Sequence, residues 1–125
     1  MNFFKHNSWA VVAKDYSMDG NAYNIVNFLK KNNYKVIGIH GENNINSCNI
    51  DMYESLKDVS HNIDVVVIID ETIETYSILD EMELLDINNI WFEQNSYNEL
   101  MIKKAKNSKL NLVYGVSLCR ELNRY

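Results

Sequence analysis

Five consecutive β-branched residues, Val65–Ile69, constrain the fold of this chain more than any other feature of its sequence. Branching at Cβ restricts side-chain rotation, which disfavours helix and favours strand. The run contains no polar residue, and this is typical of a parallel strand that is buried on both faces. Together with the preceding Asp64 it predicts a strand. Four similar short runs predict strands at Trp9–Ala13, Lys35–His40, Asn89–Glu93 and Leu110–Tyr114.

Stretches with helical periodicity separate these runs. Ala22, Ile25, Val26 and Leu29 follow the i, i+3, i+4, i+7 spacing of an amphipathic helix. The Ser96-Tyr97-Asn98-Glu99 segment has the spacing of a capping box and predicts a helix start there. The predicted helices are Asn21–Asn32, a short one at Met52–Lys57, Thr72–Leu85, one from Ser96 to about Lys106, and one or two turns at Ser117–Asn123.

Strands that alternate with helices predict right-handed βαβ units. We therefore expect one α/β domain over residues 1–125, a three-layer, Rossmann-like, doubly wound sheet of five parallel strands with helices on both faces. In such sheets a ligand binds outside the carboxyl ends of the strands, where the strand order reverses. The candidate loops are residues 14–21, 41–46, 70–72 and 94–96.

The composition of the chain limits the kinds of partner that it can bind and the compartment in which we expect it. The 125 residues carry a net charge of −5, and the absence of a broad basic surface argues against nucleic-acid and anionic-membrane binding. No apolar run is long enough to span a bilayer, and the first residues lack the apolar segment of a secretory signal. Cys48 and Cys119 are the only cysteines, too few for a disulfide framework or a zinc site. We expect a cytoplasmic protein.

Six segments, in order, resemble a known family. The chain is similar to the small stand-alone CoA-binding domains, relatives of the nucleotide-binding domain of succinyl-CoA synthetase. The family's AVVG-like, GYxVxPVNP, YxSLxDI, VDVVDIF, IVDEA and WMQ-like segments correspond to Ala10–Ala13, Asn33–His40, Tyr53–Val59, Ile63–Ile69, Ile78–Met82 and Trp91–Glu93. The resemblance covers nearly the whole chain. It implies a Rossmann-like fold and a binding module for CoA, acyl-CoA or, as the alternative, NAD or another adenine nucleotide.

The ligand site that this resemblance implies combines the first loop with the loops after the second and third strands. Free amides at the helix start near Asn21, with the helix dipole, favour a phosphate group. Lys14 is the fixed cation placed to help, and Gly20 leaves room for close approach. Residues 14–23 would hold the pyrophosphate, and the other two loops the adenosine. The candidate binding residues are Ala13, Lys14, Asp15, Tyr16, Ser17, Asn21, Ala22, Tyr23, His40, Gly41, Asp70 and Thr72.

Other interpretations stay open. The acidic residues predicted around the site, Asp15, Asp19, Glu42, Asp70, Glu71 and Glu93, oppose a polyanion, which favours a family member without ligand that serves as a structural or protein-interaction domain. A third hypothesis is a receiver-like phosphoacceptor domain, in which Asp70 would accept the phosphoryl group and Asp15 would help to bind a magnesium ion. Cys119 is a reactive thiol only if a helix start lowers its pKa, and Tyr16 and Tyr23 are candidates to stack on a base.

No catalytic motif emerges, because the chain has no P-loop, GxGxxG or recognised Ser–His–Asp or Cys–His arrangement. We therefore expect a binding module and not an enzyme, and no metal site is predicted from the His and Cys spacing. Homodimers are common among small domains, so a homodimer is a further expectation that no sequence feature locates.

Overall fold

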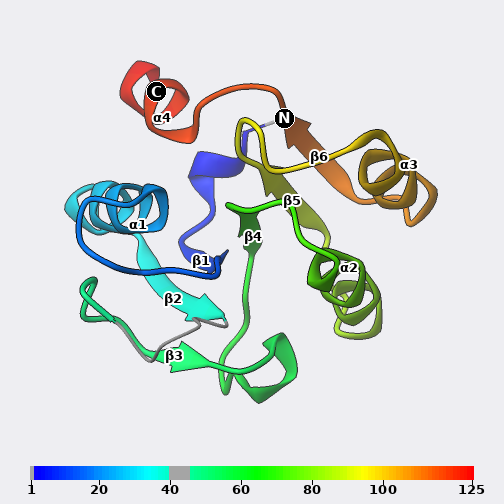
Figure 1. Ribbon diagram of the computed structural model, residues 1–125, viewed down its shortest axis with the longest axis horizontal. Helices are drawn as coiled ribbons and strands as arrows, with labels where there is room; N and C mark the ends of the chain where they lie inside the picture. The colour runs from blue at the N-terminus through cyan, green and yellow to red at the C-terminus, as the bar shows by residue number, and fades with distance from the viewer. Residues whose placement is uncertain (1, 40–45) are drawn as a thin grey trace.

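The computed structural model of the protein describes residues 2–39 and 46–125, and it contains a parallel sheet flanked by helices (Figure 1). The strands are β1 (Ser8–Val12), β2 (Lys35–Ile39), β3 (Met52–Tyr53), β4 (Val65–Ile68), β5 (Asn89–Phe92) and β6 (Asn111–Tyr114). The helices are α1 (Asn21–Lys31), α2 (Glu74–Leu84), α3 (Glu99–Asn107) and α4 (Leu118–Arg124), with short 3₁₀ turns η1 (Phe3–Lys5) and η2 (Leu56–Asp58).

The strand order is β3-β2-β1-β4-β5-β6, and every neighbouring pair is parallel. The chain builds outward from β1 in one direction and then returns to build outward in the other from β4. The order therefore reverses between β1 and β4, which is where a doubly wound sheet places its ligand crevice. This confirms the predicted doubly wound α/β fold.

Two apolar clusters, one on each face of the sheet, stabilise this arrangement. On β1, Trp9 and Val11 belong to the cluster under α1 and α4, whereas Ala10 and Val12 belong to the cluster under α2 and α3. Successive side chains of a strand point to opposite faces, so a strand covered on both sides needs apolar residues at every position. Figure 1 shows α1 and α4 on one side of the sheet and α2 and α3 on the other.

The sheet has six strands, one more than expected, because the predicted helix at Met52–Lys57 was wrong. Met52–Tyr53 instead forms the edge strand β3, followed by η2. Gly38 explains the pairing: its N–H donates to the carbonyl of Asp51 at 2.9 Å, and a Cβ on Gly38 would overlap the Met52 thioether. The absence of a side chain on the neighbouring strand lets β3 approach, and helical periodicity cannot reveal that contact.

The start of α3 also differs from the expected capping box. Asn98, not Ser96, caps this helix, since its side-chain oxygen accepts the N–H of Met101 at 2.9 Å. Ser96 is fully buried, and its hydroxyl donates to the carbonyl of Glu93 at 2.6 Å. None of the described helices has the length and hydropathy needed to cross a membrane.

Candidate functional site

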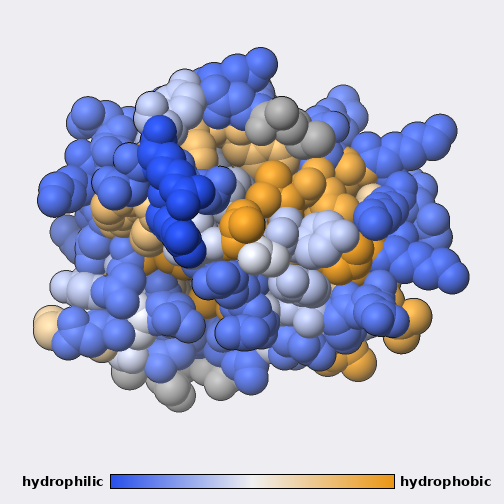
Figure 2. Space-filling view, turned by 90° about the horizontal axis from the view of Figure 1, so that it is seen from above, coloured by the Kyte–Doolittle hydropathy of each residue, from blue (hydrophilic) through white to orange (hydrophobic). Residues whose placement is uncertain are grey.

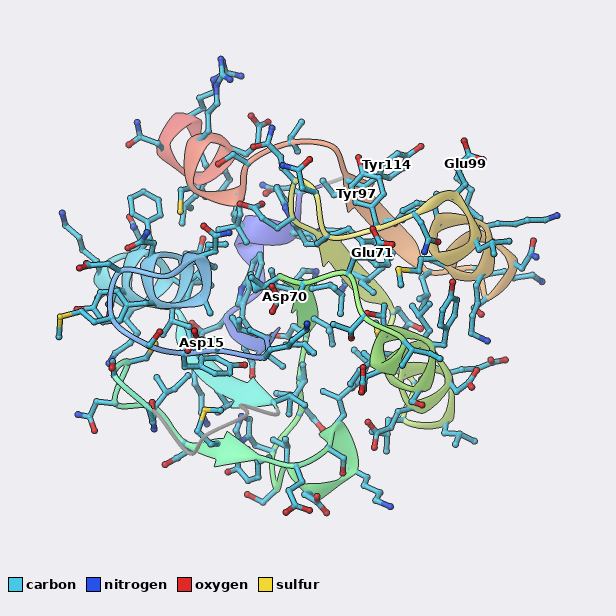
Figure 3. The ribbon with its side chains drawn as sticks, viewed as in Figure 1. Asp15, Asp70, Glu71, Tyr97, Glu99 and Tyr114 are labelled. Carbon is cyan, nitrogen blue, oxygen red and sulfur yellow. The ribbon has the colours of Figure 1, made fainter. Side chains whose placement is uncertain are left out.

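The strand order reverses between β1 and β4, so the ligand crevice expected of a doubly wound sheet would lie between the loops that leave these two strands. Five predicted site residues, Ala13 and residues 14–17, belong to the first loop, and Asp70 and Thr72 belong to the second. Figure 3 shows Asp15 and Asp70 at this edge of the sheet. His40 and Gly41, predicted after β2, lie outside the described residues, as does Glu42.

A hydrogen bond joins the two loops, and a second one connects the chain where it leaves the two strands. The main-chain N–H of Lys14 donates to Oδ2 of Asp70 at 2.9 Å, and the N–H of Ile69 donates to the carbonyl of Val12 at 3.0 Å. The side chain of Lys14 is exposed. The carboxylate of Asp70 therefore occupies a main-chain donor of the first loop.

Tyr16 lies buried at the carboxyl ends of β1 and β2. Its side chain is 0% exposed, and its hydroxyl oxygen lies 2.6 Å from the carbonyl of Val11 and 2.8 Å from that of Ile39. The same oxygen accepts the N–H of Ile39 at 3.2 Å. The hydroxyl thus joins β1 and β2 at their carboxyl ends. Burial raises the pKa of the Tyr16 hydroxyl. The ring belongs to the core, so the prediction that it stacks on a base at the surface was wrong.

The rest of the first loop is held by its own side chains and by residues 46–48. Oδ1 of Asp15 accepts the N–H of Ser17 at 2.8 Å. Hydrogen bonding by the Ser17 side chain, and to a smaller extent by its main-chain N–H, lowers the pKa of the Asp15 carboxyl. The N–H of Ser47 donates to the carbonyl of Tyr16 at 3.2 Å. These contacts fix the path by which the chain enters α1.

The amino end of α1 lacks a side-chain cap. Gly20 is the N-cap residue, and no side-chain hydrogen bond satisfies the first turn. The N–H groups of Asn21, Ala22 and Tyr23 have no partner inside the helix, as in the first turn of any α-helix. A Cβ on Gly20 would lie 3.3 Å from the carbonyl oxygen of Ser17, so glycine suits the tight approach of this loop. Ala22 is buried against the core, and Tyr23 is half-buried.

Two acidic residues at this edge, Glu71 and Glu93, accept hydrogen bonds from segments that are distant in the sequence. Oε2 of Glu71 accepts the side-chain amide of Asn98 at 3.2 Å. Oε1 of Glu93 accepts the N–H of Leu118 at 2.8 Å and the indole N–H of Trp91 at 3.2 Å. Glu93 therefore helps to cap α4, a role that the sequence analysis missed because residues 93 and 118 are far apart in the chain. Thr72 contributes its carbonyl to the turn that begins α2, accepting the N–H of Thr75 at 3.2 Å.

Glu93 makes folding stability depend on pH. Burial raises the pKa of its carboxyl above the ordinary value of 4.5, although the hydrogen bonds oppose this. The folded state thus binds the proton more tightly than the unfolded state does. The contribution of Glu93 to the free energy of unfolding falls as pH rises from about 4.5 through the raised pKa.

We expect Glu93→Gln to raise the melting temperature at pH 7, because glutamine keeps the acceptor oxygen and removes the buried charge. The difference from the wild type should vanish at pH 4, where Glu93 is protonated. Differential scanning calorimetry at both pH values measures this. The control is Glu83→Gln at an exposed position of α2. A Glu93→Gln protein that is less stable at pH 7 would show that the charge stabilises α4 more than burial penalises it.

Cys119 does not have the environment of an activated thiol. It is half-buried in the first turn of α4, and burial together with the nearby Glu93 carboxylate raises its pKa. A raised pKa keeps the thiol protonated and unreactive. Within residues 2–39 and 46–125, no group of three His, Cys, Asp or Glu side chains is arranged to hold a metal ion.

Three solved structures share this fold. A hypothetical protein from Pyrococcus horikoshii OT3 superposes with a TM-score of 0.85 at 21% identity, covering 98% of this chain and 85% of its own. A protein from Thermus thermophilus superposes with a TM-score of 0.82 at 17% sequence identity, and the match covers 98% of this chain and 92% of its own. A conserved hypothetical protein from Pyrococcus furiosus superposes with a TM-score of 0.81 at 14% sequence identity, and the match covers 93% of this chain and 99% of its own. At these identities the likeness shows the fold alone.

No curated protein matches the sequence. Residues 7–123 match the family described as the CoA binding domain. The match spans both loops of the crevice, the whole of α1 and all six strands. The chain therefore belongs to the CoA-binding domain family.

Proposed function

We propose that this protein is a binding module for CoA or an acyl-CoA, without catalysis of its own. The observation that carries the proposal is the uncapped amino end of α1 beside the reversal of strand order, in a chain of the CoA-binding domain family. The amides of Asn21, Ala22 and Tyr23 hold the pyrophosphate, since free N–H groups and the helix dipole both favour an anion there. The exposed Lys14 side chain adds a positive charge.

The adenosine part lies against the loops that follow β2 and β4. Asp70 and Thr72 belong to the second of these loops, and both are half-buried. His40 and Gly41 belong to the first. Because the two unpaired cysteines suit a reducing compartment, we place the protein in the cytoplasm. NAD or another adenine nucleotide is the alternative ligand. NAD is repelled less by nearby acidic residues than CoA is, because it carries fewer phosphates.

Thermal shift tests the proposal. With CoA, acetyl-CoA, NAD and ATP each at 1 mM, we expect the CoA compounds to raise the melting temperature most. A ligand present at about 100 times its Kd adds about 2.7 kcal/mol to the free energy of unfolding. Lys14→Glu should reduce this shift, whereas Lys31→Glu, the same charge change at the far end of α1, should not. If all four ligands leave the melting temperature unchanged, the proposal is wrong.

A second function follows if no nucleotide binds. Two groups of the chain itself lie beside the expected crevice: the Asp70 carboxylate on the amide of Lys14, and, on the β2 side of β1, the buried side chain of Tyr16. This arrangement favours a family member that acts as a structural or protein-interaction domain.

A further inference from the structure

Strand β6 forms an open edge of the sheet. It pairs with β5 on one side only, and the N–H of Asn111 donates to the carbonyl of Asn88 at 2.7 Å. Along a strand, main-chain groups point alternately to one side and the other. Since Asn111 points toward β5, the N–H and C=O of Leu112 and Tyr114 point away from the sheet. They present the hydrogen-bonding pattern that another extended segment can join.

A groove of about 610 Å³ runs beside this edge, between β6 and α3. Tyr97 and Tyr114 line it with their rings 5.5 Å apart and inclined at 73°, and Tyr114 is 43% exposed. Ile102 adds an apolar surface at its base. Figure 3 shows both tyrosines near the start of α3. Figure 2 views the side of the molecule that carries α4, β6 and α3. On this side, hydrophobic side chains are exposed among hydrophilic ones.

The charge beside β6 differs from that of the whole chain, whose net charge is −5. Lys103 and Lys106 line the groove together with one acidic residue, Glu99, and Lys109 follows α3 toward β6; all three lysines are exposed. Lys104 pairs with Asp80 at 2.7 Å, but no ion pair engages Lys103, Lys106 or Lys109 in the described part of the chain. The Lys106 ammonium lies 5.8 Å from the centre of the Tyr114 ring.

We propose that the β6 edge binds an extended acidic segment of another protein as an added strand. Main-chain bonds to Leu112 and Tyr114 would supply affinity, and the tyrosine groove would take one apolar side chain of that segment. Acidic side chains of the partner would face Lys103 and Lys106. This inference does not depend on CoA binding, because the edge lies on the opposite side of β5 from the crevice.

A second copy of this chain fits the edge less well than an acidic partner. Two β6 strands that pair antiparallel about a two-fold axis keep the same sheet face on the same side. Helix α3 would then lie beside its symmetry mate, with the unpaired lysines of one copy facing those of the other. Like charges at such a contact are unfavourable, and lysines beside an edge strand are a known protection against self-association.

The test uses a blocked peptide of alternating aspartate and valine with one central phenylalanine, added to ¹⁵N-labelled full-length protein. We expect the amide resonances of Leu112 and Tyr114 to shift and their hydrogen exchange to slow. The double variant Lys103→Glu/Lys106→Glu should raise the Kd for this peptide about tenfold, which corresponds to about 1.4 kcal/mol of binding free energy. The matched control is Lys31→Glu/Lys35→Glu, two exposed lysines away from β6. The dispersion of the ¹⁵N spectrum verifies that each variant is folded.

Two further peptides separate the sources of binding. A peptide in which lysine replaces each aspartate should not bind, because its charge has the wrong sign. An acidic peptide with an N-methylated backbone should not bind either, because it cannot donate the main-chain hydrogen bonds. Equal binding of the acidic and basic peptides, or shifts confined to residues outside α3 and β6, would overturn the proposal. So would concentration-dependent shifts of the β6 amides without peptide, because they would identify a second copy as the occupant.

Discussion

Replacing Tyr16 by alanine is expected to lower the free energy of unfolding by about 3–5 kcal/mol, the cost of removing a large buried aromatic side chain. The ring is fully buried in the cluster under α1 and α4. Its removal opens a cavity and also leaves the carbonyls of Val11 and Ile39 without the hydroxyl that lies against both. Urea denaturation followed by circular dichroism measures the change as a shift of the midpoint.

Tyr16→Phe separates the hydroxyl from the ring. This variant keeps the packing and removes only the hydrogen bonds, so we expect a loss of about 1–3 kcal/mol, the cost of unsatisfied buried polar groups. The control is Tyr23→Phe on α1, where the ring is half-buried and the hydroxyl makes no hydrogen bond to the described residues. A Tyr16→Phe protein as stable as the wild type would mean that water satisfies these carbonyls and that the hydroxyl does not hold β1 to β2.

Asp70→Asn is expected to strengthen CoA binding about tenfold. The Asp70 carboxylate lies at the crevice, and a like charge within a few ångströms of a phosphate costs about 1–4 kcal/mol. Asparagine removes this charge but retains an oxygen that can accept the N–H of Lys14. A tenfold change corresponds to about 1.4 kcal/mol. Isothermal titration calorimetry at low ionic strength, where screening is weakest, measures the Kd.

Asp70→Ala adds information that the asparagine variant lacks. Alanine also frees the main-chain N–H of Lys14, so a further gain over asparagine would show that the hydrogen bond between the loops competes with the ligand. Glu83→Gln removes one charge from the exposed face of α2 and should leave the Kd unchanged. Unaltered affinity in both Asp70 variants would place the CoA site elsewhere on the protein.

The strands of this fold could be predicted because their signal is local. Val65–Ile69 and the runs around β1, β2 and β5 are mostly apolar at successive positions, and burial on both faces of a sheet requires that pattern. β3 could not be predicted, since two residues carry no periodicity. Its pairing depends on Gly38, fourteen residues before Met52 in the sequence and directly opposite it in the sheet.

The sequence by itself determined the fold class: the alternation of strands and helices specifies a doubly wound sheet, and such a sheet binds ligands outside the carboxyl ends of its strands. The tertiary structure decided that the strand order reverses between β1 and β4. Only the tertiary structure decided what the side chains of the loops at this edge do. Tyr16 turns inward to the carboxyl ends of β1 and β2, Asp70 reaches the amide of Lys14, and Glu93 caps a helix twenty-five residues later. The reason is physical: local patterns set which residues are buried, but a hydrogen bond between distant segments depends on where the folded sheet brings them.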